Sequence, residues 1–183
     1  MIRIAGIVLV TCALCVRAGY PAANADSAIV QDFEKRVAAY LKLRKSIESD
    51  LGRLKPTKSP EQLSHHETEL GRAVRKARTN SRPGDIFTPE IAAEIRRLTA
   101  MAVQGSDGES IRRSLRHAEP VQLYLEINRT YPRSAPLQST PPSLLENLPP
   151  LPPEIEYRIA GRDLILLDAK ANLILDLIRG VFL

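Results

Sequence analysis

The hydrophobic period of this chain changes once, near Pro120, and that change limits the possible folds more than any single motif does. Before it, from Ser27 to Leu115, apolar residues recur every three or four positions, as they do on amphipathic helices. After it, short stretches alternate apolar and polar residues, as half-buried strands do. Helices first and strands last predict an α+β fold. We expect N-terminal helical hairpins, a proline-rich strap and a C-terminal antiparallel β-meander.

Residues 1–25 have the pattern of an export signal. Arg3 supplies a positive charge, residues 4–16 form an apolar segment, and residues 23–25 read Ala-Asn-Ala, with small side chains where a signal peptidase recognises them. The apolar segment is shorter than the ~20 residues that cross a bilayer as a helix. We therefore expect an exported, periplasmic or secreted protein with no stable membrane span after cleavage. An uncleaved anchor and a lipid-modified Cys15 are the alternatives.

Composition narrows the classes of partner. Both cysteines lie within the signal, so no disulfide scaffold is expected in the remainder. Arg3 and Arg17 also leave with the signal, so that 24 of the 26 basic residues face 21 acidic ones, a net charge of about +3. Three Phe and no Trp provide no stacking platform for single strands, and we expect no nucleic-acid partner. The arginines from Arg72 to Arg116 are interpreted as a solvated helix surface or as a patch for an anionic surface.

Residues 26–120 are predicted to be helical, and their first segment has the clearest pattern. Arg44 is the only charged residue in its apolar stripe, which follows alternating three- and four-residue spacings: Val30, Phe33, Val37, Tyr40, Ile47, Leu51 and Leu54. The spacing predicts a helix from Ser27 to Leu54 whose stripe is a heptad seam. The seam packs either on its own domain or, as an intermolecular coiled coil, on a partner.

Proline and glycine divide the rest of the helical region. Ser59-Pro60 has the pattern of an N-cap and a first helical residue, and we expect that second helix to end near Arg78. Its apolar side is predicted to contain Leu63, Leu70, Val74 and Ala77. Thr88-Pro89 repeats the capping pattern for a third helix, which ends at Gly105. A short fourth helix is expected to run to Pro120.

Residues 121–131 and 132–153 are expected to connect the helices to the sheet. The first segment alternates apolar and polar residues from Val121 to Ile127 and is predicted to contain a strand. The second contains eight prolines in 22 residues. Proline fixes φ and lacks an amide hydrogen, so this segment is predicted to be extended. Four leucines favour a strap that lies over the domain rather than a free linker: Leu144, Leu145, Leu148 and Leu151.

Residues 154–183 are predicted to form the antiparallel meander. Apolar and charged residues alternate over 155–159, and Gly161 follows where a tight hairpin turn needs positive φ. The continuous apolar run at 164–167 predicts a central strand covered on both faces. After a second turn over 168–172, the last strand is expected to place Leu173, Leu175 and Leu177 on one face.

One part of the second helix carries residues that could hold a metal ion. His65 and Glu69 are four residues apart and so share one side of the helix. His66 points about 100° away from His65, and His117 belongs to the fourth helix. Two ligands bind a metal weakly, so we interpret these histidines as exposed polar residues. Handling of Ni²⁺, Cu²⁺ or Zn²⁺ is an alternative.

Carboxylates near the C-terminus are the other candidates for chemistry. Asp163 and Asp168 are expected at turns, and Asp176 on the polar side of the last strand. A hairpin could bring Glu156, Asp163 and Asp168 together as an acid and a base. Asn128-Arg129-Thr130 matches a glycosylation acceptor. The sequence contains no nucleophile elbow and no phosphate-binding glycine loop, so we assign no catalytic, metal or cofactor-binding residue and no cofactor.

Several short blocks of sequence carry a resemblance to known proteins. They are Glu156-Tyr157-Arg158, Gly161-Arg162-Asp163-Leu164 with Asp168, Asn172-Leu173-Ile174 with Asp176, Pro-Pro-Ser-Leu-Leu at 141–145 and Leu-Pro-Pro-Leu-Pro at 148–152. Together they resemble the end of a group of uncharacterised exported bacterial proteins, which implies an origin in the bacterial envelope and no particular activity. The tail is also similar to the small sheet that ends periplasmic nickel/cobalt-homeostasis proteins. Neither resemblance carries functional residues over to this chain.

These patterns favour a non-enzymatic, exported accessory or binding protein of the bacterial cell envelope. We expect it to bind another envelope component, such as an envelope protein, through its helices or its proline-rich strap. The alternatives are a hydrolase that acts on an envelope polymer through its carboxylates, and a periplasmic metal-handling protein. Partner binding through the heptad seam predicts exposed apolar side chains along it. The sequence does not indicate an oligomeric state.

Overall fold

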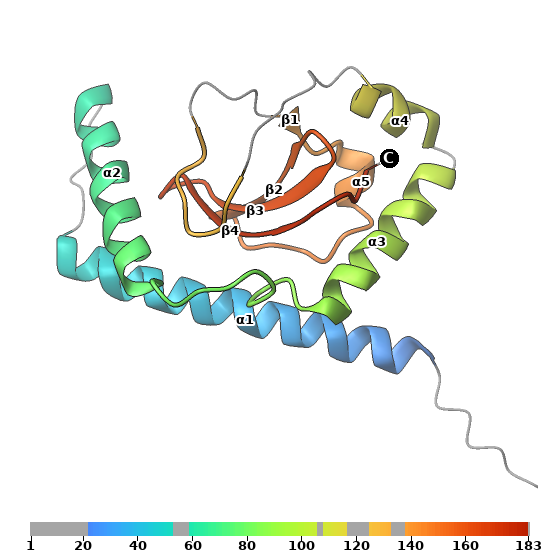
Figure 1. Ribbon diagram of the computed structural model, residues 1–183, viewed down its shortest axis with the longest axis horizontal. Coiled ribbons are helices and arrows are strands. Elements are labelled where there is room, and N and C mark those ends of the chain that lie inside the picture. The colour runs from blue at the N-terminus through green and yellow to red at the C-terminus, as the bar shows by residue number, and fades with distance from the viewer. Residues whose placement is uncertain (1–21, 53–58, 106–107, 117–124, 133–137, 183) are drawn as a thin grey trace, which may run out of the picture.

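A long helix and a small sheet organise the molecule. The computed structural model describes residues 22–52, 59–105, 108–116, 125–132 and 138–182. Helix α1 (Ala22–Leu51) runs beneath the sheet, and α2 (Pro60–Ala77) and α3 (Pro89–Gln104) rise at its two sides (Figure 1). The short α4 (Gly108–Arg116) follows α3 at the end of the molecule opposite α2.

The heptad seam of α1 is buried within the chain itself. Phe33, Val37 and Tyr40 are each at most 5% exposed and belong to the main hydrophobic core. Of the two arrangements that the pattern allowed, the structure has the seam packed on its own domain. Leu51, at the end of the helix, is 41% exposed, and Leu54 lies outside the described residues.

Both ends of α1 differ slightly from the prediction. The helix begins at Ala22, five residues before the expected start at Ser27. It ends at Leu51, and Gly52 follows with a φ of +80°. A left-handed glycine just after a helix is a common end signal, because glycine adopts positive φ without a Cβ clash.

The capping patterns place the other helices as predicted. Ser59 Oγ accepts a hydrogen bond from the backbone N–H of Gln62, and α2 begins at Pro60 and ends at Ala77. Helix α3 begins at Pro89, after Thr88, and ends directly before Gly105. The predicted apolar side of α2 is only half buried. Leu70 and Val74 enter the core, whereas Leu63 and Ala77 are exposed.

The sheet has four antiparallel strands in the order β1-β2-β3-β4. The strands are β1 (Gln138–Ser139), β2 (Ile155–Ala160), β3 (Asp163–Asp168) and β4 (Leu173–Ile178). Gly161 turns the first hairpin with a φ of +59°, and residues 169–172 make the second turn. The predicted α+β fold with a C-terminal antiparallel meander is therefore confirmed. The fourth strand comes from the proline-rich strap.

The proline-rich strap lies against the domain. It contributes β1, which pairs with Ile159 and Arg158 of β2, and a single helical turn, α5 (Pro142–Leu145). Its residues Leu144 and Leu148 are buried in the main core. The strap therefore contains a short strand and a helical turn, and it places Leu144 and Leu148 in the core.

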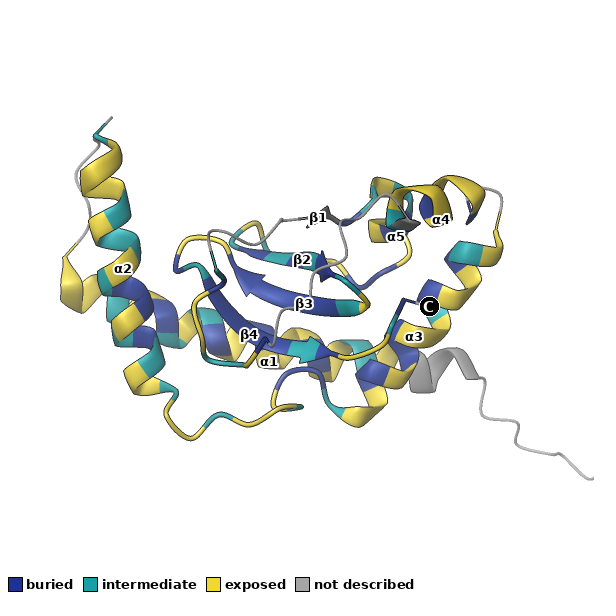
Figure 2. Cartoon of the chain, turned by 45° about the horizontal axis from the view of Figure 1, so that its top comes forward, coloured by how far each residue is buried: buried dark blue, intermediate teal, exposed yellow. Residues whose placement is uncertain are grey.

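The main core lies between the helices and one face of the sheet, as the burial colours show (Figure 2). Phe87 stands in the loop before α3, between Phe33 of α1 and Tyr157 of β2. Its ring stacks on Phe33 at 5.7 Å and 9°, and on Tyr157 at 6.4 Å and 7°. Three near-parallel aromatic rings thus connect a helix, a loop and a strand that are distant in sequence.

A second, smaller core covers the other face of the sheet. It contains Leu125, Tyr131, Ala160, Ile165, Leu167 and Ile174. All four residues of the apolar run at 164–167 are at most 4% exposed, and they divide between the two cores. The prediction that β3 is covered on both faces is therefore confirmed.

Segment 125–131 does not continue the strand pattern that its sequence suggests. Residues 121–124 lie outside the described residues, and Leu125 to Arg129 are irregular or turning. The segment instead runs along the outer edge of β4. The Asn128 N–H donates to Ile174 O, the Ile174 N–H donates to Arg129 O, and Thr130 bridges Leu173. It covers an edge that would otherwise offer unpaired backbone groups.

A β-bulge changes which side chains of β4 face the helices. Leu166 pairs with Asp176, but Leu167 pairs with Ile174, so Leu175 is the extra residue. Leu173 and Leu175 face the main core as predicted, whereas Leu177 packs against the second core. The prediction for Leu177 is wrong because one inserted residue reverses the alternation beyond it.

Candidate functional site

The carboxylate of Asp168 lies at the end of β3 and is completely buried. Its Oδ2 accepts a hydrogen bond from Tyr40 Oη at 2.5 Å. Its Oδ1 accepts from the backbone N–H groups of Lys170 and Ala171, both at 2.9 Å. Asp168 therefore joins helix α1 to the turn between β3 and β4, and its oxygens are committed to the fold.

Arg44 explains the single charged position in the heptad seam. It is only 5% exposed, and its Nε lies 3.6 Å from Asp168 Oδ2. Its Nη2 lies 3.5 Å from Glu154 Oε1. The seam thus includes a charge where the sheet places a buried carboxylate. Beside this pair, burial and then the negative charge of Asp168 raise the pKa of Tyr40 above its ordinary value, so Tyr40 stays a hydrogen-bond donor.

Asp176 was predicted on the polar side of the last strand, and that prediction is wrong. The bulge at Leu175 turns Asp176 toward the helices, where it is completely buried. Its Oδ2 accepts from the backbone N–H groups of Ile86 and Phe87, both at 2.9 Å. The N–H of Gly84 also reaches the carboxylate, at 3.2 Å. Asp176 therefore shapes the loop that precedes α3.

The three carboxylates considered for acid–base chemistry are not brought together. Asp163 and Asp168 stand at opposite ends of β3, roughly 17 Å apart at ~3.3 Å per residue. Glu156 pairs in register with Leu167, one residue from the Ile155–Asp168 pair, so its side chain points to the opposite face of the sheet from Asp168. Asp163 instead accepts from the Gly180 N–H and from Arg179.

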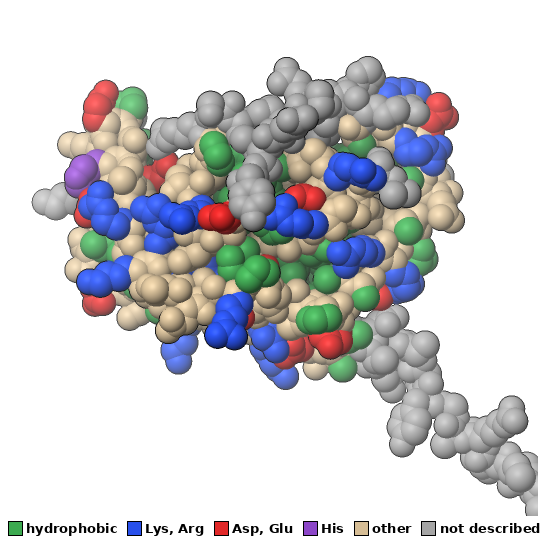
Figure 3. All heavy atoms as spheres, viewed as in Figure 1, with side chains coloured by type: hydrophobic (Ala, Val, Ile, Leu, Met, Phe, Trp, Pro, Cys, Tyr) green, Lys and Arg blue, Asp and Glu red, His purple; other side chains and the backbone are tan. Residues whose placement is uncertain are grey.

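A basic groove lies between α2 and the segment along the β4 edge. It is a shallow hollow of about 510 Å³ that is wide open to solvent, and it is lined by Arg72, Arg75, Lys76, Thr79, Ser81, Glu126, Ile127, Asn128 and Arg129. Four of these side chains are basic and one is acidic. Figure 3 shows Lys and Arg side chains at the α2 end of the molecule and others spread over the rest of the same face. We name this feature the basic groove.

One wall of the basic groove is formed by α2 and the turn that follows it. Arg72, Arg75 and Lys76 have the i, i+3 and i+4 spacing that puts side chains on one face of a helix, and Thr79 belongs to the turn. Gly71, the neighbouring residue, lets the helix approach the sheet. A Cβ on Gly71 would stand 2.8 Å from Ala171 O, closer than real Cβ contacts allow. The wall is thus held against the turn between β3 and β4.

Asn128 anchors the other wall to the first. Its Nδ2 donates to the carbonyl oxygens of Arg75 and Arg78, each at 3.1 Å, at the C-terminal end of α2. Its backbone has a φ of +57°, and Asn tolerates this left-handed region better than most residues. Arg75 Nη1 also donates to Thr130 Oγ1 at 3.2 Å across the groove. The amide of the predicted glycosylation acceptor is thus part of the fold.

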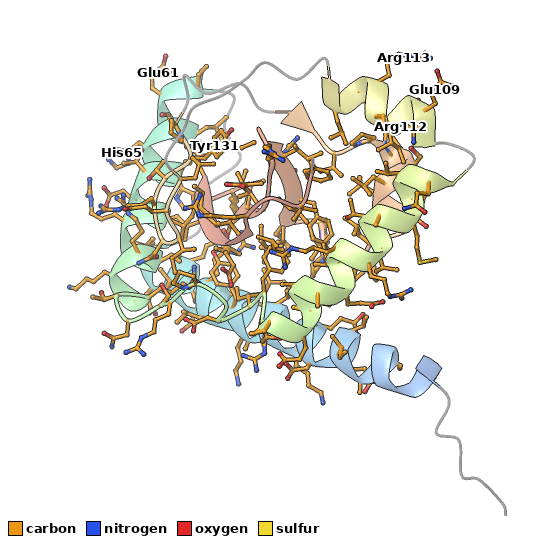
Figure 4. The ribbon with its side chains drawn as sticks, turned by 45° about the vertical axis from the view of Figure 1, so that its right-hand side comes forward. Glu61, His65, Glu109, Arg112, Arg113 and Tyr131 are labelled. Carbon is orange, nitrogen blue, oxygen red and sulfur yellow. The ribbon has the colours of Figure 1, made fainter. Side chains whose placement is uncertain are left out.

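The predicted metal ligands are not gathered into a site in the part of the chain that the structure describes. His65 is exposed on the outer side of α2, away from the sheet (Figure 4). Glu69, its predicted co-ligand, pairs with Arg72 Nη1 at 2.6 Å. His117 lies outside the described residues. Among the described residues, no three His, Cys, Asp or Glu side chains are placed to share one metal ion.

Two further hollows lie on either side of the proline-rich strap. One, of about 450 Å³, separates the strap from β2 and includes the exposed Leu145 and the ion pair of Glu156 with Arg158. The other, of about 330 Å³, separates residues 150–152 from α1. Both have mostly apolar linings, and Pro150 and Leu151 contribute to each.

Comparison with known proteins supplies no relative. No family model, no curated protein and no solved structure matches the chain. Within the described ranges, none of the helices combines the length and the hydropathy needed to cross a membrane.

The sequence indicates one wall of the basic groove and not the other. The arginines of α2 belong to the series that the sequence offers as a patch for an anionic surface. Their counterpart, Arg129, falls within the predicted strand segment 121–131, and no sequence pattern indicates that it faces α2. The available signal was Asn128-Arg129, because Asn is enriched at positive φ and often marks a turn.

Proposed function

We propose that this chain is an exported accessory protein of the bacterial cell envelope, and that it acts by binding rather than by catalysis. The basic groove is then the surface that binds an acidic component of the envelope. The observation that carries this proposal is the convergence of Arg72, Arg75, Lys76 and Arg129 on one groove of about 510 Å³.

The placement of the carboxylates also supports binding over hydrolysis. Asp168 and Asp176 each accept backbone N–H groups from turns or loops and are completely buried. Asp163 and Glu156 stand apart from Asp168, as the strand register requires. An acid–base mechanism needs two carboxyl groups at one site with different environments. The described residues offer no such pair among these candidates.

The export part of the proposal is supported by residues 1–25 alone. Arg3, the apolar segment and the Ala-Asn-Ala sequence before Asp26 are the features a signal peptidase substrate shows. Fractionation of bacterial cells that express the full chain tests it. We expect the shortened protein outside the cytoplasm, and retention of the full-length chain inside the cell contradicts export.

Site-specific photocrosslinking tests the proposed binding surface. A photoreactive amino acid at Ile127 stands in the lining of the basic groove, and one at Ser110 stands on α4 at the opposite end of the molecule. We expect a discrete crosslinked product in envelope fractions from the Ile127 position. Addition of salt reduces its yield, because exposed charges are screened within about 10 Å at 0.1 M ionic strength.

The Ser110 position is the matched control, since Ser110 is exposed and lies among the Arg112 and Arg113 charges. A product of the same size and yield from both positions contradicts a specific groove. The absence of any product from Ile127 in a correctly exported protein contradicts the proposed function.

A further inference from the structure

The arrangement of cations in the basic groove points to one class of ligand. We infer that the groove binds a molecule that carries two or three phosphate groups in a row, an inference that rests on the proposed function. The cations from Arg72 to Lys76 span about 6 Å along α2, at 1.5 Å per residue, and Thr79 follows in the turn after the helix. Arg129 faces this stripe of cations from the other wall. A row of phosphate groups can therefore contact α2 along its length and the opposite wall together.

The arginines keep donors for such a ligand although some already have partners. Arg72 pairs with Glu69 through Nη1, and Arg129 pairs with Glu126 through Nε. Each guanidinium has five N–H donors in a planar fork, so one ion pair leaves the others. The two side chains are 64% and 70% exposed, so a ligand can reach them. Guanidinium forks bind phosphate oxygens with two parallel hydrogen bonds.

The charge of the groove favours phosphate over carboxylate. Four basic side chains face one acidic side chain, Glu126, in the lining. A terminal phosphate carries about −1.5 to −2 charges at pH 7, whereas a carboxylate carries one. Two or three phosphate groups can therefore neutralise the cations within the length of the stripe. Fewer anionic groups have to lose their water than in a polycarboxylate of the same total charge.

Titration calorimetry with inorganic tripolyphosphate tests the inference, and citrate, a tricarboxylate, is the comparison ligand. We expect tripolyphosphate to bind about tenfold more tightly than citrate, because it offers more charge-assisted hydrogen bonds. The variant R72Q/K76Q removes two exposed cations from one wall, and R129Q removes one from the other. Each variant is expected to weaken tripolyphosphate binding by about tenfold or more.

The control variant R112Q/R113Q removes two exposed arginines from α4, at the far end of the molecule (Figure 4). It is expected to bind tripolyphosphate like the unchanged protein. Circular dichroism confirms that each variant is folded. Equal binding by the groove variants, or equal binding of citrate, overturns the inference.

A vesicle experiment separates a soluble phosphate chain from a lipid headgroup. We expect tripolyphosphate to bind while vesicles of phosphatidylglycerol and of phosphatidylcholine both sediment without the protein, because each of these headgroups carries a single phosphate group rather than a row of them. Binding to phosphatidylglycerol vesicles without binding of tripolyphosphate overturns the inference. If the Ile127 crosslink forms but no phosphate binds, the proposed function stands and only this inference fails.

Discussion

Tyr40 and Asp168 are 128 residues apart in the sequence, and a 2.5 Å hydrogen bond joins their side chains in the core. The bond connects the middle of α1 to the end of the central strand. Both groups are almost completely buried. The relationship also accounts for the position of Arg44, one helical turn after Tyr40, which balances the buried carboxylate. The long helix and the sheet are therefore held in one relative orientation by polar as well as apolar contacts.

Substitution of Tyr40 by Phe is expected to lower the free energy of unfolding by about 1–2 kcal/mol. The ring still fills the core, but the buried Asp168 loses one of its hydrogen-bond donors. Urea denaturation at pH 7 measures the change. A stability equal to that of the unchanged protein would contradict a structural role for the bond.

The protein is expected to lose stability as the pH rises above about 10. Burial raises the pKa of both Tyr40 and Tyr157 above the ordinary value of 10.0. The unfolded chain then releases these protons first and binds fewer protons than the folded chain, so the free energy of unfolding falls with pH. Below pH 10 the contribution is fully present. Each tyrosine adds a slope of up to about 1.4 kcal/mol per pH unit.

Urea denaturation between pH 9 and pH 11 measures this slope. The Y40F/Y157F variant lacks both groups and should have a flatter pH dependence. If the slope of the double variant equals that of the unchanged protein, other groups cause the alkaline loss.

Substitution of Asp176 by Asn is expected to destabilise the protein by about 2–4 kcal/mol. The carboxylate accepts the N–H groups of Gly84, Ile86 and Phe87, and an amide nitrogen in place of one oxygen would face these donors without accepting. D50N, at an exposed position on α1, is the matched control and should change stability little. Thermal unfolding followed by circular dichroism distinguishes the two variants.

Substitution of Gly71 by Ala is expected to displace α2 and to weaken ligand binding in the basic groove. The new methyl group would stand 2.8 Å from the carbonyl oxygen of Ala171, so the helix must move away from the turn. We expect a loss of about 1–3 kcal/mol, as for overpacked sites. G105A should be tolerated, because its Cβ would meet only ordinary contacts at 3.5 Å. Unfolding curves and tripolyphosphate titration test both variants.

Substitution of Val37 by Asp is expected to unfold the protein. If the seam were a binding surface for a partner protein, the same change would weaken binding and leave the fold intact. Val37 is 2% exposed, and an isolated carboxylate there would be buried without a counter-charge. A39D, on the exposed side of the same helix, should remain folded. Far-ultraviolet circular dichroism decides between these outcomes. A folded V37D protein would show that the seam of α1 is not part of the core.

Local patterns were sufficient for the elements and for their order along the chain. The Ser59-Pro60 and Thr88-Pro89 pairs begin helices because proline has a fixed φ suited to the first helical position, and at Ser59 the side chain also caps the helix. Gly161 turns the first hairpin because glycine accepts positive φ. The apolar run at 164–167 predicts a strand covered on both faces, because four adjacent apolar residues place side chains on both sides of it. These signals depend on residues a few positions apart.

Only the tertiary structure decided which polar groups meet. The bulge at Leu175 turns Asp176 inward, and a one-residue insertion in a strand pairing leaves no periodic signal in the sequence. Arg44 became a buried partner of Asp168 because the helix crosses the sheet at that residue. The basic groove likewise needs Asn128 to bind the end of α2, a contact across about 50 residues. Long-range packing sets such contacts, because they depend on where whole elements come to rest against one another.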